Sequence, residues 1–296
     1  MCKILIPIAA LFVLLPSAQA QTSDLTAATQ QIQKLIADSH ADVAIALHSL
    51  DGQTEWLYHA DEPFHAASTM KIPVMIEFFR QASEHQLNTG DKVLVHNEFH
   101  SIVDGSTYKL DPADDSETDL YKDEGRSQAL IELCVLMITQ SSNLATNLLI
   151  EKLGIENIRA TVHAYGADGM NVLRGVEDGK AFEKGMNNTT TARALLTLLT
   201  PIAQYKAIDA KWSKSMVGIL LAQEFNDGIP AGLPKEIRVA HKTGEITKIN
   251  HDAAIVYAKR PYILVVLTRG IEDRKVSSQL IADISRTLYP VVESGQ

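Results

Sequence analysis

The chain has 296 residues, of which 46% are hydrophobic and 21% charged, so it is long and apolar enough to bury a sizeable core. This composition excludes a disordered or repetitive chain, and no Pro/Gly/Ser-rich linker divides it, which favours one catalytic unit. The formal net charge of −9 argues against a nucleic-acid partner.

The first twenty residues resemble an export signal. A basic start at Lys3 is followed by an apolar run from Ile4 to Leu15 and by the small-residue sequence Ala18-Gln19-Ala20. We therefore predict cleavage after Ala20 and a periplasmic or secreted protein without a stable membrane anchor. The run is shorter than the roughly 18 apolar residues of a spanning helix, so an uncleaved anchor is the weaker alternative.

The two cysteines cannot form an internal disulfide in the mature chain. Cys2 falls within the predicted signal, and Cys134 lies in the apolar stretch from Leu130 to Ile138. Cys134 is therefore expected to be a buried, unpaired thiol.

The first part of the mature chain is predicted to fold as helix, hairpin and helix. The segments are a helix over Leu25–Ile36, strands over Ala41–Leu50 and Thr54–His59, and a helix over Ser68–Phe79. Asp51-Gly52 is typical of a hairpin turn between the two strands. Ser68 or Ala67 is expected to cap the second helix.

Residues 86–125 differ in kind from the segments on either side. They are polar, acidic and rich in turn residues, which predicts a long surface excursion. Helical periodicity then returns over Ser127–Thr139, Asn143–Leu153, Ile155–Ala164, Thr189–Leu199 and Trp212–Leu221. Three strand-like runs and a last helix follow, over Ile237–Thr243, His251–Tyr257, Tyr262–Thr268 and Ser277–Leu288.

These elements predict an α/β protein of the α+β type. Strands at both ends of a largely helical chain favour one antiparallel five-stranded sheet built from both termini, with flanking helices and a separate all-helical lobe. We expect the sheet lobe to comprise about residues 21–64 and 212–296, and the helical lobe about residues 65–211. One cleft between two lobes is enough for a monomer to act on a small molecule.

Three short motifs occur in a fixed order along the chain. They are Ser68-Thr69-Met70-Lys71, Ser141-Ser142-Asn143 and Lys242-Thr243-Gly244. In a helix, residues three apart share a face, so the Ser68 hydroxyl and the Lys71 amine are expected to lie within hydrogen-bond reach. Burial or neighbouring cations would lower the pKa of Lys71, and a neutral amine can accept the proton of a serine nucleophile.

The same residues suggest how an anionic intermediate would be held. Ser68 at a helix start directs free backbone N–H groups toward it, which supplies half of an oxyanion hole. The backbone N–H of Glu245, just after the third motif, is the candidate for the other half. Gly244 would let a ligand approach the strand edge closely.

A bare S-x-x-K is a weak signal, and the chain contains a second one, Ser106-Thr107-Tyr108-Lys109. That copy follows Asp104-Gly105 in the excursion and lacks helical periodicity, so its serine and lysine need not share a face. Ser68 instead opens an apolar helical run.

The three motifs together resemble those of class A β-lactamases and the related serine-acylated penicillin-recognising enzymes, which carry S-x-x-K, S-D-N and K-T-G. The resemblance covers nearly the whole mature chain and implies their β-lactamase/transpeptidase-like fold. It implies Ser68 as the acylated nucleophile, Lys71 as its base or proton relay, and Ser141 as proton donor toward the leaving nitrogen.

The resemblance also implies the substrate contacts. Asn143 would bind the side-chain amide of the substrate, and Lys242 and Thr243 would hold the carboxylate of a β-lactam or a D-alanyl peptide. The backbone N–H groups of Ser68 and Glu245 would form the oxyanion hole. No cofactor is implied.

Two departures from the family pattern concern the middle of the chain. Ser142 stands where the family usually has aspartate, which we expect to change the rigidity of the loop more than its chemistry. The first two motifs are also farther apart than is usual in the family. The extra length falls in residues 96–125, which we expect near the entrance of the site.

The third departure concerns deacylation. Class A enzymes carry a glutamate in an R-x-E-x-x-L-N pattern, which activates the water that clears the acyl-enzyme. Here Arg174 is followed three residues later by Glu177, without the rest of that pattern. Glu177 is the first candidate for the base, Glu183 and Asp178 are weaker ones, and the alternative is that all three are solvated loop acids.

Other constellations are weaker. His96 and His100 have i, i+4 spacing but no H-E-x-x-H pattern and no evident third ligand, so no metal site is predicted. His251 and Asp252 follow the third motif after a turn, where a structural role is favoured over a catalytic one. Arg269 at a strand end is a candidate second partner for a substrate carboxylate.

Three functions fit these observations. The first is a serine β-lactamase that acts through an acyl-enzyme on Ser68. The second is a D-alanyl-D-alanine peptidase or penicillin-binding protein with slow deacylation, which the altered glutamate pattern favours. The third is a non-hydrolytic module that is acylated once and stops.

Overall fold

The computed structural model describes residues 17–294, with side chains from residue 24 onward. The export signal predicted over residues 1–20 falls on residues 1–16, which lie outside the described residues, and on the start of helix α1 (Ser17–Ser39). Within residues 17–294, no helix is both long and apolar enough to cross a membrane.

One antiparallel five-stranded sheet forms the centre of one lobe. Its strands are β1 (Asp42–Ser49), β2 (Glu55–Tyr58), β9 (Arg238–Ile246), β10 (Ile249–Tyr257) and β11 (Tyr262–Arg269). Their order across the sheet is β2-β1-β11-β10-β9, so β1 pairs with β11 and both ends of the chain meet in the middle of the sheet. The predicted fold class and sheet are confirmed.

The strand that carries the third motif is longer than predicted. Its pairing with β10 continues beyond Thr243 to Ile246, which lies opposite Ile249. Lys242-Thr243-Gly244 therefore lies inside β9 and not at its end. Among residues 17–294, β10 is the one strand that pairs with β9. Strand β9 is therefore an edge strand, and alternate N–H groups of an edge strand point away from the sheet.

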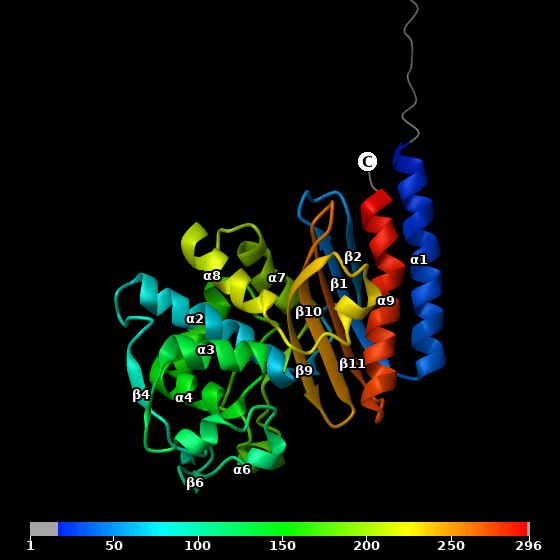
Figure 1. The fold of residues 1–296 in the computed structure, drawn as a ribbon. Coiled ribbons are helices and arrows are strands. Elements are labelled where there is room, and N and C mark those ends of the chain that lie inside the picture. Colours follow the sequence, from blue (N-terminus) through cyan, green and yellow to red (C-terminus); the bar gives the residue numbers. More distant parts are fainter. Residues whose placement is uncertain (1–16, 295–296) are drawn as a thin grey trace, which may run out of the picture.

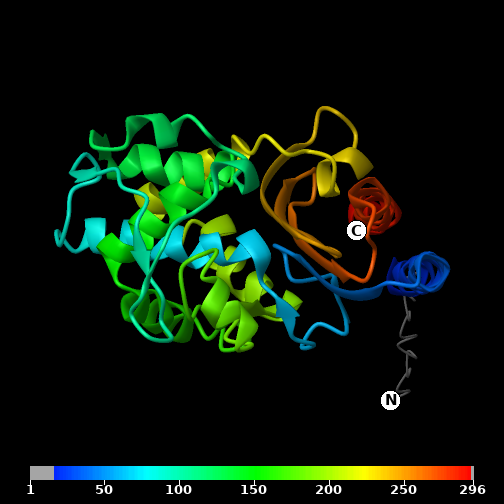
Figure 2. The same ribbon diagram turned by 90° about the horizontal axis from the view of Figure 1, so that it is seen from below.

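Helices cover both faces of the sheet (Figures 1 and 2). Ile45 and Leu47 of β1 belong to the cluster with α1 and α9 (Arg274–Ser294), two helices that pack side by side. Ala44 and Ala46 point to the opposite face, where helix α7 (Ala192–Ala203) packs on β1 and β11. Burial on both faces explains why the central strands are almost continuously apolar.

The second lobe is a group of helices around α2 (Lys71–Ser83). Every residue from Lys71 to Phe79 is buried, because neighbouring helices enclose α2 on several sides. These neighbours are α3 (Leu130–Thr139), α4 (Asn143–Leu153), α5 (Ile155–Ala164) and α8 (Ala210–Leu221). The bounds of α4 and α5 are those predicted, and Cys134 of α3 is a buried free thiol as expected.

Three short elements complete this lobe and explain one shifted boundary. They are β3 (Phe64–His65), which pairs with β8 (Thr189–Thr190), and helix α6 (Gly179–Glu183). The helix predicted from Thr189 begins only at Ala192, because Thr189 and Thr190 are in β8 and Thr191 caps α7.

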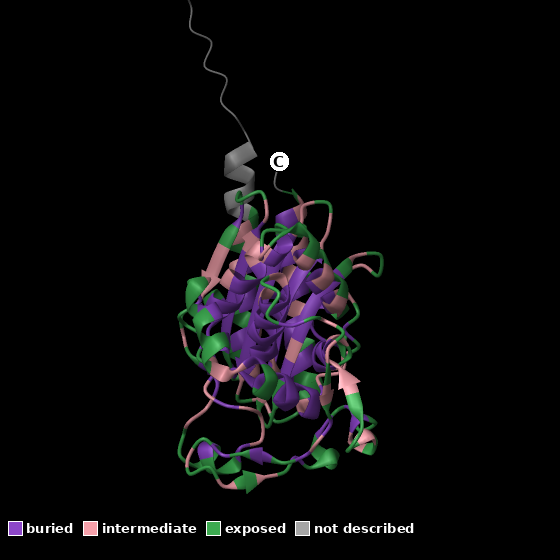
Figure 3. Cartoon of the chain, turned by 90° about the vertical axis from the view of Figure 1, so that its left-hand side faces the viewer, coloured by how far each residue is buried: buried purple, intermediate pink, exposed green. Residues whose placement is uncertain are grey.

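The excursion is a surface segment in which exposed and half-buried residues alternate with a few buried ones (Figure 3). Strand β4 (Lys92–Leu94) pairs with β7 (Ser127–Ala129), and β5 (Phe99–His100) pairs with β6 (Thr107–Tyr108). Two 3-10 turns, η2 (Pro112–Asp114) and η3 (Leu120–Asp123), follow. Its buried apolar side chains, which belong to the main core, are Leu87, Val95, Phe99, Leu110 and Leu120.

The tight contact between α9 and the turn η4 (Ile229–Gly232) gives a stability prediction. A Cβ atom on Gly232 would overlap the carbonyl oxygen of Ala282 and lie 2.9 Å from the backbone nitrogen of Arg286. Because backbone atoms cannot move aside cheaply, we expect Gly232→Ala to lower the free energy of unfolding by about 1–3 kcal/mol. Denaturant unfolding measures this change.

Gly218→Ala in α8 is the matched control. A Cβ there meets nothing within 4 Å, so alanine should leave stability unchanged or raise it by up to about 1 kcal/mol, as its helix propensity predicts. Equal denaturation midpoints for Gly232→Ala and the parent chain would contradict the packing argument.

Candidate active site

Ser68 lies in a short 3-10 helix, η1 (Ala67–Met70), that leads directly into α2. The expectation that Ser68 or Ala67 caps this helix is wrong. Its N-cap is Ala66, which has no side-chain capping bond, and Ala67 has a φ of +45°. Ser68 is half-buried and is one of the residues that line a cavity.

Lys71 is fully buried at the start of α2 and reaches across to the second motif. Its Nζ donates hydrogen bonds to the carbonyl oxygen of Ser141 at 2.6 Å and to Oδ1 of Asn143 at 2.9 Å, and it lies 3.3 Å from the Ser141 hydroxyl. In the described part of the chain, its hydrogen bonds do not include the Ser68 hydroxyl. The expected Ser68–Lys71 hydrogen bond is thus replaced by bonds to Ser141 and Asn143.

Burial lowers the pKa of Lys71 to about 7, although the carboxylates of Asp115 and Glu177 act in the opposite direction. A large fraction of this amine is therefore neutral near pH 7. A neutral amine at the start of α2, three residues after Ser68, is suited to accept the proton of a serine hydroxyl.

Ser141 connects the two lysines of the motifs. Its hydroxyl accepts hydrogen bonds from Nζ of Lys242 at 3.0 Å and from Nζ of Lys71 at 3.3 Å. Burial lowers the pKa of Lys242 well below its usual value, the nearby Lys71 ammonium lowers it further, and Asp252 opposes both. A hydroxyl between two amines is placed to relay a proton.

Strand β9 comes unusually close to the helix start of Ser68. A Cβ on Gly244 would lie 3.1 Å from the backbone nitrogen of Thr69 and 3.2 Å from that of Ser68. Only glycine leaves this approach open without displacing backbone. Ser68 and Glu245 consequently line the same cavity, as the oxyanion-hole hypothesis requires.

The cavity has a volume of about 190 Å³ and is lined by residues from widely separated segments of the chain. Its lining comprises Ser68, Asp114, Ser116, Ser141, Asn143, Phe225, Asp227, Thr243, Glu245, Asn250 and Arg274. Five of the predicted site residues are in this lining, and Lys71 and Lys242 are buried beside it, bonded to Ser141. The excursion supplies Asp114 and Ser116, in keeping with its expected position at the entrance.

The basic side chain in this cavity is Arg274, not Arg269. Arg274 pairs with Glu245 at 2.6 Å and Asp227 at 3.1 Å. Arg269 pairs instead with Asp42 and lies over the ring of Phe64, so the structure does not bring it to the cavity. Arg274 belongs to no motif, and only the turn between β11 and α9 brings it to the site.

Glu177 is connected to the site through Asn143. Its Oε1 accepts a hydrogen bond from Nδ2 of Asn143 at 2.7 Å, and its backbone has a φ of +61°. Burial raises the pKa of Glu177, the hydrogen bond from Asn143 opposes this, and the carboxylates of Asp115 and Asp114 add to it. One Asn143 side chain thus joins Glu177 to Lys71.

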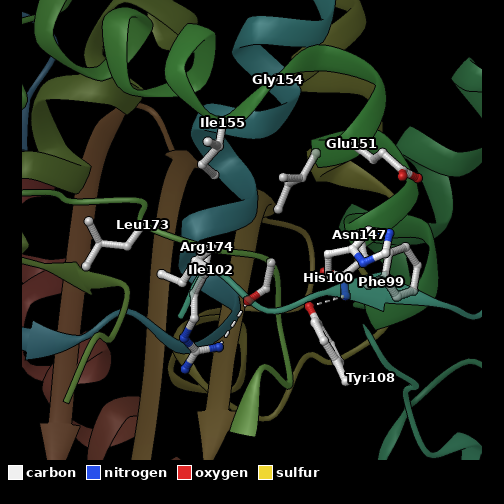
Figure 4. A pocket seen from close by; sticks show the side chains of 12 residues that line it. Phe99, His100, Ile102, Tyr108, Asn147, Glu151, Gly154, Ile155, Leu173 and Arg174 are labelled. Carbon is white, nitrogen blue, oxygen red and sulfur yellow. Dashed lines mark hydrogen bonds between the residues drawn. The ribbon is translucent and has the colours of Figure 1, made fainter. Parts of the chain in front are cut away.

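The loop that carries Glu177 is held from behind by Asn147 and Tyr108, at a second cavity of about 270 Å³ (Figure 4). Asn147 Oδ1 accepts a hydrogen bond from the backbone N–H of Val176 at 2.7 Å. The Tyr108 hydroxyl donates a hydrogen bond to the backbone carbonyl oxygen of Val176 at 3.2 Å. A Cβ on Gly175 would lie 2.6 Å from Asn147 Oδ1, so glycine permits the contact. The loop has a fixed path despite its unusual sequence.

The two weaker candidates for the base have other surroundings. Asp178 is buried, accepts hydrogen bonds from the Ser101 hydroxyl and the Ile102 N–H, and caps α6. Glu183 is exposed at the end of α6. Glu177 alone of the three is bonded to Asn143.

The remaining candidates from the sequence have structural surroundings. Ser106 is hydrogen bonded to Asp104 and followed by strand β6, so the second S-x-x-K is not helical. His251 is buried against the carbonyl oxygen of His65, and burial lowers its pKa to about 4. Within residues 24–294, no cluster of three or more His, Cys, Asp or Glu side chains is arranged to hold a metal ion.

The buried state of Lys71 can be tested directly. Its amine should titrate near pH 7 and not near the ordinary value of 10.5. Glu177→Gln should lower the pKa further, because it removes a carboxylate that stabilises the ammonium form. NMR of isotope-labelled lysine side chains, assigned with Lys71→Arg, measures both values, and titration of Lys71 near its ordinary value would contradict the model of the site.

Known proteins share both the sequence and the fold of this chain. A model of the β-lactamase enzyme family matches residues 27–292. The chain is 26% identical to a β-lactamase of Streptomyces albus G over 78% of its length and 74% of the relative's. It is also 26% identical to β-lactamase Toho-2 of Escherichia coli, over 92% of its length and 91% of the relative's.

Among solved structures, PBP-A superposes with a TM-score of 0.79 at 27% identity, over 91% of this chain and 97% of PBP-A. A mutant of PBP-A, solved as an acyl-enzyme complex with penicillin G, superposes with a TM-score of 0.78 at 28% identity, over the same shares of the two chains, 91% and 97%. With the family match extending over both lobes and all three motifs, the chain belongs to the β-lactamase enzyme family.

Proposed function

We propose that this protein is a serine β-lactamase that opens β-lactams through an acyl-enzyme on Ser68. The Ser68 oxygen attacks the lactam carbonyl carbon, and its proton passes to the neutral amine of Lys71. The backbone N–H groups of Ser68 and Glu245 stabilise the oxyanion. When the carbon–nitrogen bond breaks, the leaving nitrogen takes a proton through Ser141, which leaves an ester on Ser68.

The substrate is held by residues on both sides of the cavity. Asn143 binds the side-chain amide of the substrate, and Lys242 and Thr243 hold its carboxylate. Gly244 keeps β9 close enough for this contact. The proposal is supported by the cavity, which brings Ser68, Asn143 and Thr243 together from three distant parts of the chain.

Deacylation completes the cycle. Glu177 takes a proton from a water molecule as the water oxygen attacks the ester carbonyl carbon. The bond from this carbon to the Ser68 oxygen then breaks, the proton held by Glu177 returns to the Ser68 oxygen, and the opened product leaves as a carboxylic acid. The observation that carries this step is the 2.7 Å hydrogen bond from Asn143 to Glu177, which ties the carboxylate to the residue that also contacts Lys71.

A second candidate is a D-alanyl-D-alanine peptidase or penicillin-binding protein. The similarity to PBP-A and the incomplete glutamate pattern after Arg174 favour it. Such a protein would release D-alanine from a peptide and retain penicillin as a long-lived ester. A non-hydrolytic module would form the same adduct and turn over neither substrate.

We further propose that the protein is exported and acts as a monomer outside the cytoplasm. The basic start, apolar run and Ala18-Gln19-Ala20 sequence within residues 1–20 support export.

Mass spectrometry of the purified protein with a small excess of penicillin tests the hydrolytic function. We expect the drug to disappear while the protein stays unmodified, because deacylation keeps pace with acylation. Glu177→Gln should accumulate an adduct of one opened penicillin per chain, since general-base help contributes about 10²–10⁴-fold. Ser68→Ala should form no adduct.

Glu183→Gln is the matched control, because it makes the same change on an exposed residue at the end of the neighbouring helix α6. It should turn over penicillin like the parent chain. Unchanged turnover in Glu177→Gln would overturn the assignment of the base. A lasting adduct in the parent chain would favour the peptidase or the binding module, which release of D-alanine from a model peptide distinguishes.

The pKa of Lys71 predicts the pH dependence of the first step. Below about pH 7 the amine is mostly an ammonium ion and cannot accept the serine proton, whereas above it the neutral form dominates. The acylation rate of Ser68, measured by rapid quenching before the first turnover, should therefore rise with pH through about 7. A rate that stays constant across this range would exclude Lys71 as the base.

A further inference from the structure

The N-terminus of α4 carries the second motif and needs more partners than its own residues supply. The first N–H groups of a helix have no acceptor within the helix. Ser142 is the N-cap, and its hydroxyl accepts a hydrogen bond from the N–H of Ala145 at 3.2 Å. The N–H groups of Asn143 and Leu144 require acceptors from elsewhere.

The excursion provides that acceptor. Oδ2 of Asp115 accepts hydrogen bonds from the N–H groups of Asn143 at 2.8 Å and Leu144 at 3.0 Å. The same oxygen accepts one from the Tyr121 hydroxyl at 2.9 Å, and Oδ1 accepts one from the N–H of Glu117 at 3.3 Å. Asp115 is 8% exposed, so these bonds are shielded from water.

The carboxylate of Asp115 is thus fixed on both sides. Tyr121 and the N–H of Glu117 hold it from the excursion, and α4 holds it from the helical lobe. A negative charge at a helix N-terminus is stabilised by the helix dipole. The contact joins a surface segment that has no recognisable motif to the first residue of the helix that begins in the site.

The residue held in this way has a central place in the site. Asn143 accepts a hydrogen bond from Lys71 and donates one to Glu177. Ser141, two residues earlier, has a φ of +59°, a backbone conformation that its surroundings must maintain. A shift at the start of α4 would displace contacts to Lys71 and Glu177 together.

We propose that Asp115 is a positioning residue of this active site, which fixes the Ser141–Asn143 segment on Lys71 by capping α4 from the excursion. The inference rests on the proposed acylation of Ser68. It also assigns a role to the extra length between the first two motifs.

Asp115 acts on the site through its charge as well. Its carboxylate raises the pKa values of Lys71, from α2, and of Glu177, from the loop after Arg174. The other titratable groups near it are the Tyr121 hydroxyl and the neighbouring carboxyls of Glu117 and Asp114. Loss of the Asp115 charge should therefore let Lys71 lose its proton at lower pH.

Two substitutions separate the cap from the charge. Asp115→Asn removes the charge but keeps an oxygen that can accept the two N–H groups, whereas Asp115→Ala removes both. The control Asp119→Asn makes the same chemical change in the same excursion, where only an exposed pair with Lys122 is lost. The full-length proteins are compared by their rate of labelling with a fluorescent penicillin, measured by rapid quenching before the first turnover between about pH 5 and 9. They are also compared by hydrogen exchange of the peptide that contains residues 143–144.

We expect Asp115→Ala to label about 10²-fold more slowly at the optimum, because a small displacement of catalytic groups has an effect of this size. Its residues 143–144 should exchange faster. Asp115→Asn should keep labelling within about tenfold of the parent and move the acid limb of the pH profile to lower pH. Asp119→Asn should match the parent in both measurements.

Labelling of Asp115→Ala at the parent rate, or an acid limb that does not move in Asp115→Asn, would overturn the inference. If Asp115→Ala does not fold, the acid limb of Asp115→Asn decides. If the parent chain is not labelled even before the first turnover and consumes no penicillin, the proposed function fails. Hydrogen exchange then decides the inference independently, because unchanged exchange at residues 143–144 in Asp115→Ala would overturn it.

Discussion

The burial of the Lys71 amine is the constraint on which the rest of the site depends. An ammonium group removed from water is costly unless it is hydrogen bonded or loses its proton, and Lys71 shows both responses. Its Nζ donates hydrogen bonds to Ser141 and Asn143, and its pKa falls to about 7. Because α2 is enclosed by other helices, these acceptors must come from a neighbouring element, which is the start of α4.

Three backbone positions at the site have left-handed conformations that non-glycine residues seldom adopt. They are Ala67, beside the nucleophile, and Ser141 and Glu177 themselves, with φ values of +45°, +59° and +61°. Each costs on the order of 1–3 kcal/mol and persists only where the surroundings over-determine it. Each of the three residues has a contact that holds its backbone in place. Strand β9 packs against η1 near Ala67, Asp115 caps α4 next to Ser141, and Asn147 binds the loop just before Glu177.

The sequence predicted the parts of the site that depend on local spacing. The motifs with Ser68, Ser141 and Lys242 lie close together as expected, since the first two stand at the starts of helices that the sequence predicts and the third lies in a strand that it predicts. Contacts between segments far apart in the chain were not predictable in this way. The bond from Asp115 to α4 and the pairing of Arg274 with Glu245 join residues far apart in the chain and have no periodicity. The capping expectation for Ser68 was wrong because η1 packs on β9 and β10 and needs no side-chain cap.

The two buried lysines explain how substrate binding would favour the first step. Each amine would repel a proton on the other, and Ser141 lies between them. In the proposed reaction, a substrate carboxylate beside Lys242 would stabilise its ammonium form and raise its pKa. The charge on Lys242 would in turn oppose protonation of Lys71. The substrate would therefore help to keep Lys71 neutral at the moment when the proton of Ser68 must be accepted.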